Sequence, residues 1–343
     1  MPAARDLLEQ LLEGTDLSQP QAEELLGLLT EGTTPPALIG AVLAALRAKG
    51  AVAAEVRGFA EAMRRLARQP ALPPAIRAID IVGTGGDSSG SFNISTGTAL
   101  LTAACGLPVI KHGNRSVSSR AGSADVLEAL GLPMPLDERS AGDCLRRCGF
   151  TFLFAPHYHA ATQAVAAARR ALGVRTVFNI LGPLTNPAQP PLRLIGAFSL
   201  PVAQLMAEAL AGMRIERAFV VHGAEGWDEP TPVGPFTLFD VIPGQVSRQE
   251  RLPEDYGLPR CRPADLAGGD ARHNAEALRA VLCGETHGAH RDCLLLGAAL
   301  ALEVAGEVGS ARAGIERAAR AIDEGAAARV VRELARTGAT HER

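Results

Sequence analysis

The chain has 343 residues, 47% of them hydrophobic, with 34 basic and 37 acidic side chains and a net charge of −3. This length allows two domains with a sizeable core, the apolar content excludes a disordered chain, and the lack of excess positive charge disfavours a nucleic-acid partner. No apolar run reaches the roughly 18 residues of a membrane helix, and the first residues contain no signal-peptide core. We therefore expect a cytoplasmic protein that does not bind membranes.

Four amphipathic helices are predicted at the start of the chain. Apolar residues recur there at three-to-four spacing, and most of these segments end in glycine. The predicted helices cover residues 6–14, 21–32, 37–50 and 53–67. Pro73 and Pro74 follow them. We predict a small all-helical domain over residues 1–75, joined by helical residues near 160–190.

From Ile79 onward, short apolar runs alternate with helical segments. This alternation is typical of an α/β domain with a mainly parallel central sheet, which we predict over residues 76–343. Strands are predicted at 79–83, 108–111, 152–155, 192–198, 218–223 and 236–241. Helices are predicted at 95–106, 124–131, 141–149, 161–173 and 202–213, with an alanine-rich pair within 311–335.

A glycine-rich segment follows the first predicted strand and precedes a helix. Its glycines are Gly83, Gly85, Gly86 and Gly90. Backbone N–H groups in such a turn can bind phosphate, but the spacing fits neither common phosphate-loop motif, so a plain tight turn is an equally good interpretation. Asn93, Ser95 and Thr96 at the helix start are either N-caps or further phosphate contacts.

A second polar loop, residues 111–125, follows the next predicted strand and has almost no apolar side chain. At the carboxyl end of a neighbouring strand it would face the glycine segment across a crevice, the usual ligand position in open α/β sheets. A lone histidine is more often structural, but His112 has Lys, Gly and Asn beside it, which favours contact with a ligand. The two loops together predict a phosphorylated ligand.

Several blocks of the sequence resemble the anthranilate phosphoribosyltransferase family, a branch of the class III nucleoside phosphorylase-like transferases. These blocks are DIVGTGGD, FNIST, KHGNRSVSSRAGSADVLEALG and RTVFNILGPLTNPA. They resemble the pyrimidine nucleoside phosphorylase branch less closely. The resemblance extends over nearly the whole chain.

The resemblance implies a magnesium-dependent pentosyltransferase of tryptophan biosynthesis. In its reaction the amine of anthranilate displaces pyrophosphate from C1 of 5-phosphoribosyl-1-pyrophosphate (PRPP), which residues 76–343 would bind with two Mg²⁺ ions. We expect no catalytic protein nucleophile, because the acceptor amine is itself nucleophilic and the protein must mainly orient two substrates and stabilise developing charge.

The resemblance also implies the residues of the donor and metal sites. The residues implied for PRPP are Gly83, Thr84, Gly85, Gly86, Asp87, Asn93, Ser95, Thr96, Lys111 and Ser119. Those implied for magnesium are Ser95, Asp228 and Glu229. An adjacent Asp-Glu pair is usually a solvated surface feature, but this pair follows an apolar strand and a glycine turn, where two carboxylates can converge on a cation.

The acceptor residues implied by the resemblance are Gly85, His112, Asn114 and Arg169. A guanidinium binds a carboxylate through two hydrogen bonds, which suits Arg169 to anthranilate. Arg169 and Arg170 lie about 100° apart on a helix, so we expect one of them to face the site, and a solvated helix face is the alternative for either.

The acceptor side also departs from the family pattern, at Ala160, Thr162, Gln163 and Ala164. A small threonine on the same helical face as Arg169 would enlarge or reshape the acceptor pocket. A second hypothesis is therefore a paralogue that transfers phosphoribose to another aromatic acceptor.

Pro230 and Gly297 are further departures, and we expect neither to touch a residue assigned to chemistry. A third hypothesis, a non-catalytic relative that binds nucleic acid, is disfavoured by the intact GTGGD segment and the net charge. The helical domain resembles the dimer-forming surface of the family, so we expect a homodimer.

Overall fold

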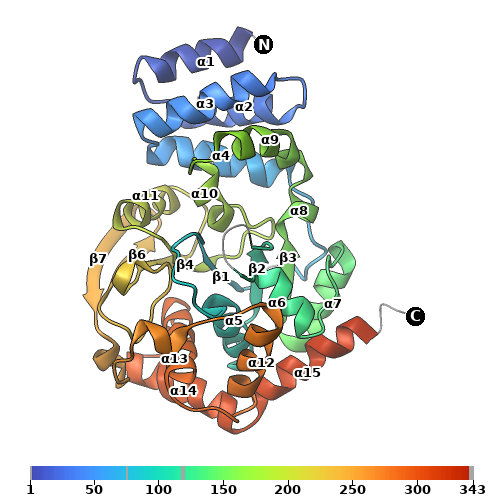
Figure 1. Ribbon diagram of the computed structural model, residues 1–343, viewed down its shortest axis with the longest axis vertical. Coiled ribbons are helices and arrows are strands. Elements are labelled where there is room, and N and C mark those ends of the chain that lie inside the picture. Colours follow the sequence, from blue (N-terminus) through green and yellow to red (C-terminus); the bar gives the residue numbers. More distant parts are fainter. Residues whose placement is uncertain (1, 75, 117–119, 340–343) are drawn as a thin grey trace.

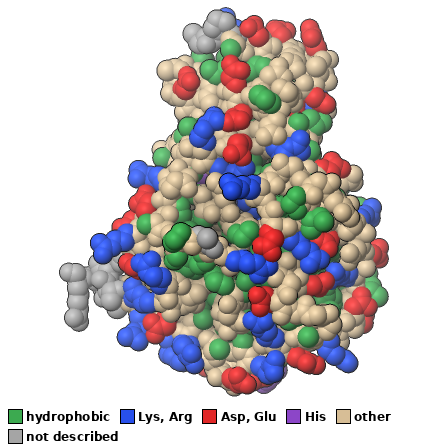
Figure 2. Space-filling view, turned by 180° about the vertical axis from the view of Figure 1, so that it is seen from behind, with side chains coloured by type: hydrophobic (Ala, Val, Ile, Leu, Met, Phe, Trp, Pro, Cys, Tyr) green, Lys and Arg blue, Asp and Glu red, His purple; other side chains and the backbone are tan. Residues whose placement is uncertain are grey.

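The computed structural model describes residues 2–74, 76–116 and 120–339 (Figure 1). A narrow bundle of helices stands on a wider α/β part, which confirms the predicted fold class. On the face that Figure 2 shows, acidic and basic side chains are interspersed over both parts. This mixture fits the near-neutral net charge. Ser119, implied for the donor site, lies outside the described residues.

The bundle contains the four predicted helices with small shifts at their ends. They are α1 (Pro2–Leu12), α2 (Gln19–Thr30), α3 (Pro36–Lys49) and α4 (Ala53–Leu66). The side chain of Ser18 accepts a hydrogen bond from the amide of Gln21 and caps α2. A distant helix, α9 (Gln163–Leu172), packs against α2 and α3 and buries Val165 and Ala168 in the same core (Figure 1).

In the described residues, seven strands form one sheet in the order β3-β2-β1-β4-β5-β6-β7. The strands are β1 (Ile79–Gly83), β2 (Val109–Gly113), β3 (Phe150–Phe154), β4 (Leu192–Gly196), β5 (Arg217–His222), β6 (Phe236–Ile242) and β7 (Gln245–Arg251). The first five are parallel, whereas β6 and β7 pair antiparallel to their neighbours. We did not predict β7, because its polar sequence shows no apolar alternation at this sheet edge.

Helices surround the sheet on both faces (Figure 1). They are α5 (Ile94–Ala104), α6 (Ser123–Ala129), α7 (Glu138–Cys148), α11 (Leu200–Ala211), α12 (Ala271–Leu282), α13 (Ala289–Val304), α14 (Ala311–Asp323) and α15 (Ala326–Ala339), with the short α8 (Ala155–Tyr158) and α10 (Phe178–Leu181). We did not predict α12 or α13, and α13 is buried nearly all round, so it lacks an amphipathic period. Within the described ranges, no helix combines the length and the apolar character needed to cross a membrane.

The strand order brings separate chain segments to one edge of the sheet. β1 lies between β2 and β4, and its last residue, Gly83, pairs in register with Gly196, the last residue of β4. The segment after β5 carries Asp228 and Glu229 back to this edge. The site is therefore built where parallel strands end, as is usual in open α/β sheets.

Candidate active site

Two glycines make room for Asp228 at the ends of β1 and β4. A Cβ on Gly196 would lie 1.5 Å from the carbonyl oxygen of Asp228, and a Cβ on Gly83 would lie 2.4 Å from its Oδ2. Any side chain at position 196 would collide with backbone, which cannot rotate away. These glycines are therefore required for the close approach of the Asp228 segment to the strand ends.

Backbone amides of the glycine segment and of α5 hold the two carboxylates. The amide of Gly85 donates to Asp228 Oδ2 at 2.5 Å, and the amide of Ser95 donates to Glu229 Oε1 at 3.1 Å. A third carboxylate joins them, because Asp87 Oδ2 accepts from the amide of Asp228 at 3.3 Å. Asp87, Ser95, Asp228 and Glu229 therefore lie together at this edge of the sheet.

The environment disfavours negative charge on this pair. Burial, together with the negative charge of Asp87, raises the pKa of Asp228. Burial and the charge of Asp228 raise the pKa of Glu229. Converging carboxylates that destabilise one another form a site that a cation would stabilise.

The residues fit magnesium in the way this ion usually binds to enzymes. Mg²⁺ takes oxygen ligands and is commonly held by one or two carboxylates together with substrate phosphates. Across the described residues, no group of three or more His, Cys, Asp or Glu side chains is arranged to hold a metal by itself. Asp228 and Glu229 therefore suit an ion that arrives with a phosphorylated substrate better than a permanently bound one.

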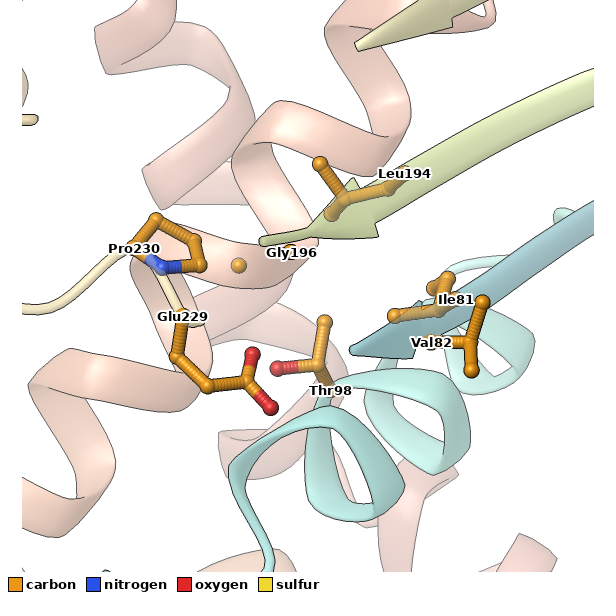
Figure 3. A pocket seen from close by; sticks show the side chains of 8 residues that line it. Ile81, Val82, Thr98, Leu194, Gly196, Glu229 and Pro230 are labelled. Carbon is orange, nitrogen blue, oxygen red and sulfur yellow. The ribbon is translucent and has the colours of Figure 1, made fainter. Parts of the chain in front are cut away.

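A cavity of about 10 Å³ lies behind Glu229, lined also by Thr98, Pro230 and Gly297. In Figure 3 the Glu229 carboxylate lies beside Thr98, whose buried Oγ1 has no hydrogen-bond partner in the part of the chain that the structure describes. This volume is at the lower limit for one water molecule. Pro230 and Gly297, which depart from the family pattern, line the same cavity as Glu229.

The glycine segment presents free backbone amides. Gly85 and Gly86 adopt left-handed φ values of +70° and +72°, and Ser88 has φ +63°. No described residue accepts a hydrogen bond from the amides of Gly86, Asp87 or Ser88. Consecutive unpaired N–H groups in such a turn form an anion-binding concavity. We call residues 85–88 the donor loop.

Thr84 and Lys111 contact the residues that form the carboxylate site. Thr84 Oγ1 accepts from the amide of Phe198 at 3.1 Å and lies 3.4 Å from Asp228 Oδ2. Lys111 is 1% exposed, and its Nζ donates to the carbonyl of Ile81 and to Ser95 Oγ. Burial lowers the pKa of Lys111, against the opposing effect of the nearby carboxylates. In this arrangement Lys111 positions Ser95.

The helix start contains Asn93 and Thr96, two of the three residues whose role the sequence left open. Asn93 occupies the N-cap position of α5 but makes no capping hydrogen bond with its side chain. Its Nδ2 donates to the carbonyl of Ala121 at 3.2 Å, and its Oδ1 accepts from Asn274 at 2.8 Å. Thr96 is fully buried. Asn93 thus links the start of α5 to the second polar loop rather than capping the helix.

His112 lies buried at the end of β2. Its Nδ1 is 3.1 Å from the carbonyl of Gly182, so we assign the ring proton to Nδ1. This leaves Nε2 as a buried acceptor without a partner among the described residues. The centre of the His159 ring lies 5.0 Å from the centre of the His112 ring. Burial, reinforced by repulsion from His159, lowers the pKa of His112 to about 3. The imidazole is therefore neutral at physiological pH.

The other residues implied for the acceptor, Asn114 and Arg169, make few contacts with the rest of the site. Asn114 is exposed, and its Oδ1 accepts from the amide of Arg115 at 2.7 Å. Arg169 is half-buried on α9 with its guanidinium 5.1 Å from the centre of the Phe178 ring. In the described part of the chain it forms no ion pair, and burial lowers its pKa. Arg170 is exposed. The structure therefore leaves Arg169 available for an anion but gives it no bond to the donor loop.

Sequence reasoning missed three supporting residues, which are Asp80, Asn186 and Arg175. Asp80, fully buried, accepts from the amide of His112 at 3.2 Å and from Asn186 Nδ2 at 2.9 Å. A charge inside the apolar run IDIVG was the available signal for Asp80. Arg175 donates to the carbonyl of Gly86, and nothing in its local sequence indicated this contact.

Comparisons with known proteins agree with this geometry. Residues 5–67 match the helical bundle domain of the glycosyl transferase family, and residues 75–328 match its a/b domain. An anthranilate phosphoribosyltransferase of Desulforudis audaxviator is 47% identical over 94% of this chain and 93% of its own length.

Solved structures give the same result. The anthranilate phosphoribosyltransferase of Thermus thermophilus superposes with a TM-score of 0.91 at 38% identity, covering 97% of this chain and 99% of its own. The Saccharomyces cerevisiae enzyme in complex with PRPP and Mg superposes with a TM-score of 0.89 at 27% identity, covering 98% of both chains. The chain therefore belongs to the anthranilate phosphoribosyltransferase family of glycosyltransferases.

Proposed function

We propose that the chain transfers the phosphoribosyl group of PRPP to the amine of anthranilate. A C1–N bond forms as the C1–O bond to pyrophosphate breaks, and the amine releases one proton to solvent. The observation that carries this proposal is the meeting of free donor-loop amides with Asp87, Asp228 and Glu229 at one edge of the sheet. This combination suits a magnesium-bound pyrophosphate and requires no protein nucleophile.

On the donor side, the amides of Gly86, Asp87 and Ser88 would bind the pyrophosphate. Gly83, Thr84 and Gly85 hold the Asp228 segment in place, and Asn93, Ser95, Thr96 and Lys111 would complete the PRPP site. The amides supply positive potential where the leaving group gains charge, and they are already oriented before the reaction.

For the metal, Asp228 and Glu229 would hold one Mg²⁺ ion and Ser95 would contact a second. Mg²⁺ bound with PRPP neutralises charge on the departing pyrophosphate. Support comes from the burial and the neighbouring carboxylates that raise the pKa of both Asp228 and Glu229, and from the Saccharomyces cerevisiae relative described in complex with PRPP and Mg.

On the acceptor side, Arg169 would pair with the anthranilate carboxylate. Its guanidinium is half-buried without an acidic partner in the described part of the chain, so an incoming carboxylate would relieve an unpaired charge. The neutral His112, with its unpaired Nε2, can accept a hydrogen bond from the substrate amine but is too weak a base to carry a proton at neutral pH. Asn114 and Gly85 would border the aromatic ring.

The acceptor segment favours a second candidate, a paralogue with another aromatic acceptor. Residues 160–162 form a short 3-10 helix, and Thr162 Oγ1 donates to the carbonyl of His159 at 2.7 Å. The Thr162 hydroxyl is therefore bonded to its own backbone.

The test is the loss of anthranilate fluorescence with purified protein, Mg²⁺ and PRPP. We expect loss that requires all three components. If anthranilate is not consumed while calorimetry still detects binding of PRPP with Mg²⁺, the paralogue is favoured, and a panel of aromatic amines should then identify the acceptor. Absence of both turnover and PRPP binding would refute both candidates.

We also propose a homodimer formed through the helical domain over residues 1–75, and a cytoplasmic location. The dimer proposal rests on the resemblance of the helical domain to the dimer-forming surface of the family. Sedimentation at micromolar concentration should give a dimer, and a monomer would contradict the proposal. Cell fractionation tests the location.

A further inference from the structure

Arg175 connects the acceptor side of the site to the donor loop. It lies in the segment between α9 and α10, yet its Nη2 donates to the carbonyl of Gly86. The same guanidinium lies 4.0 Å from the centre of the Phe198 ring, and Phe198 in turn donates its amide to Thr84 Oγ1. Two separate contacts therefore fix Arg175 against the loop and the residues beside it.

The backbone of Arg175 is held by the helical bundle. Its carbonyl accepts a hydrogen bond from Arg47 Nη1, at the end of α3, at 2.6 Å. A continuous path of contacts thus runs from α3 through Arg175 to Gly86. The helical bundle and the donor loop are coupled through this one residue, although they lie far apart in the sequence.

The bond to Gly86 determines the direction of a donor-loop amide. In a planar trans peptide the C=O and the N–H point in opposite directions, so holding the carbonyl of Gly86 fixes the N–H of Asp87 on the far side. That N–H is one of the amides without an acceptor in the described residues. Gly86 has φ +72° and no side chain, so without such a contact this peptide would be free to rotate.

We propose that Arg175 is a positioning residue for the PRPP donor. It holds the peptide between Gly86 and Asp87 so that the Asp87 amide faces the pyrophosphate, and it ties this orientation to the helical bundle. This inference rests on the function proposed above. An arginine suits the task because its planar guanidinium can donate a hydrogen bond and stack on an aromatic ring at once, which a lysine ammonium does less well.

The alternative is that Arg175 acts only through its positive charge near an anionic substrate. Three variants separate the two explanations. Arg175→Ala removes charge and contacts, and Arg175→Lys keeps the charge. Arg170→Ala, in α9, removes an exposed arginine whose side chain bonds to no described residue. The measurements are calorimetric binding of PRPP with Mg²⁺, and KM and kcat for each substrate.

We expect Arg175→Ala to weaken PRPP binding about tenfold, as for loss of one charge-assisted hydrogen bond, with the anthranilate KM within about twofold of wild type. Arg175→Lys should recover less than half of this loss on a logarithmic scale, and Arg170→Ala should bind PRPP normally. Full recovery with lysine, or unchanged binding by Arg175→Ala, would overturn the proposal.

Hydrogen exchange in the ligand-free protein gives a readout that does not depend on activity. Amides in a peptide covering residues 83–92 should exchange faster in Arg175→Ala than in wild type or Arg170→Ala. Equal exchange in all three proteins would show that Arg175 does not hold the loop. If wild type fails to bind PRPP, the proposed function fails, whereas the exchange comparison still decides whether Arg175 orders the loop.

Discussion

Replacement of Gly196 by alanine would place a Cβ 1.5 Å from the carbonyl oxygen of Asp228 and 2.5 Å from its carbonyl carbon. The Asp228 peptide would have to move by about 2 Å to reach van der Waals distance. Because Asp228 and Glu229 are consecutive, this movement would pull both carboxylates away from the amides of Gly85 and Ser95 that hold them.

The expected loss is large in activity and moderate in stability. A misplacement of about 1 Å in a catalytic site can cost on the order of a hundredfold in rate, so we expect kcat/KM of Gly196→Ala to fall at least about a hundredfold. Overpacking should lower the free energy of unfolding by about 1–3 kcal/mol. Steady-state kinetics at saturating Mg²⁺ and urea denaturation measure the two effects separately.

Two further alanine variants provide the comparison. Gly27→Ala, in α2, adds a Cβ with no atom within 4 Å, so activity should be unchanged and stability should rise by up to about 1 kcal/mol. Gly83→Ala would meet the Asp228 carboxylate at 2.4 Å, and a side chain can rotate, so we expect a smaller loss of rate with an altered Mg²⁺ dependence. Activity of Gly196→Ala within tenfold of wild type would refute this reasoning.

Three other substitutions test separate parts of the site. The double variant Asp228→Asn, Glu229→Gln should lower kcat at least about a hundredfold and change the Mg²⁺ dependence while the circular dichroism spectrum is retained; an unchanged Mg²⁺ response would remove both residues from the metal site. Arg169→Ala should raise the anthranilate KM about tenfold; an effect confined to PRPP would mean that Arg169 serves the donor. Burial lowers the pKa of His159 from 6.5 to about 4. Below pH 6.5 the unfolded chain therefore binds a proton that the folded chain does not, and the free energy of unfolding falls. His159→Gln should remove about 2 kcal/mol of the loss between pH 7 and pH 5 in urea denaturation, whereas the exposed control His287→Gln should not.

The sequence predicts those elements whose structure follows from the local pattern of apolar residues. The strand at 79–83 has the predicted bounds, because an apolar run ends there in glycine, and the four amino-terminal helices follow from their amphipathic spacing. The polar edge strand β7 and the nearly fully buried helix α13 lack these patterns, since the first has little apolar contact and the second is apolar on most sides.

The candidate site was predictable in its residue types and less so in its contacts. The glycine segment stands out by composition, whereas the Asp228-Glu229 pair is identified by the family resemblance and by its place after an apolar strand and a glycine turn. That Gly196 must be small because Asp228 crosses it depends on two segments 32 positions apart meeting in space, and the hydrogen bond from Arg175 to Gly86 spans 89 positions. Pairings of this kind arise from the sheet order, which no local pattern specifies.

The packing of α9 against α2 and α3 has a consequence for how the chain folds during synthesis. The amino-terminal helices leave the ribosome first, but Val165 and Ala168, which fill part of their core, are made about a hundred residues later. At 5–20 residues per second this delay is on the order of ten seconds. During that interval the bundle exposes an apolar face at α2 and α3, so nascent chains stalled before residue 163 should be the species that chaperones bind and proteases cleave.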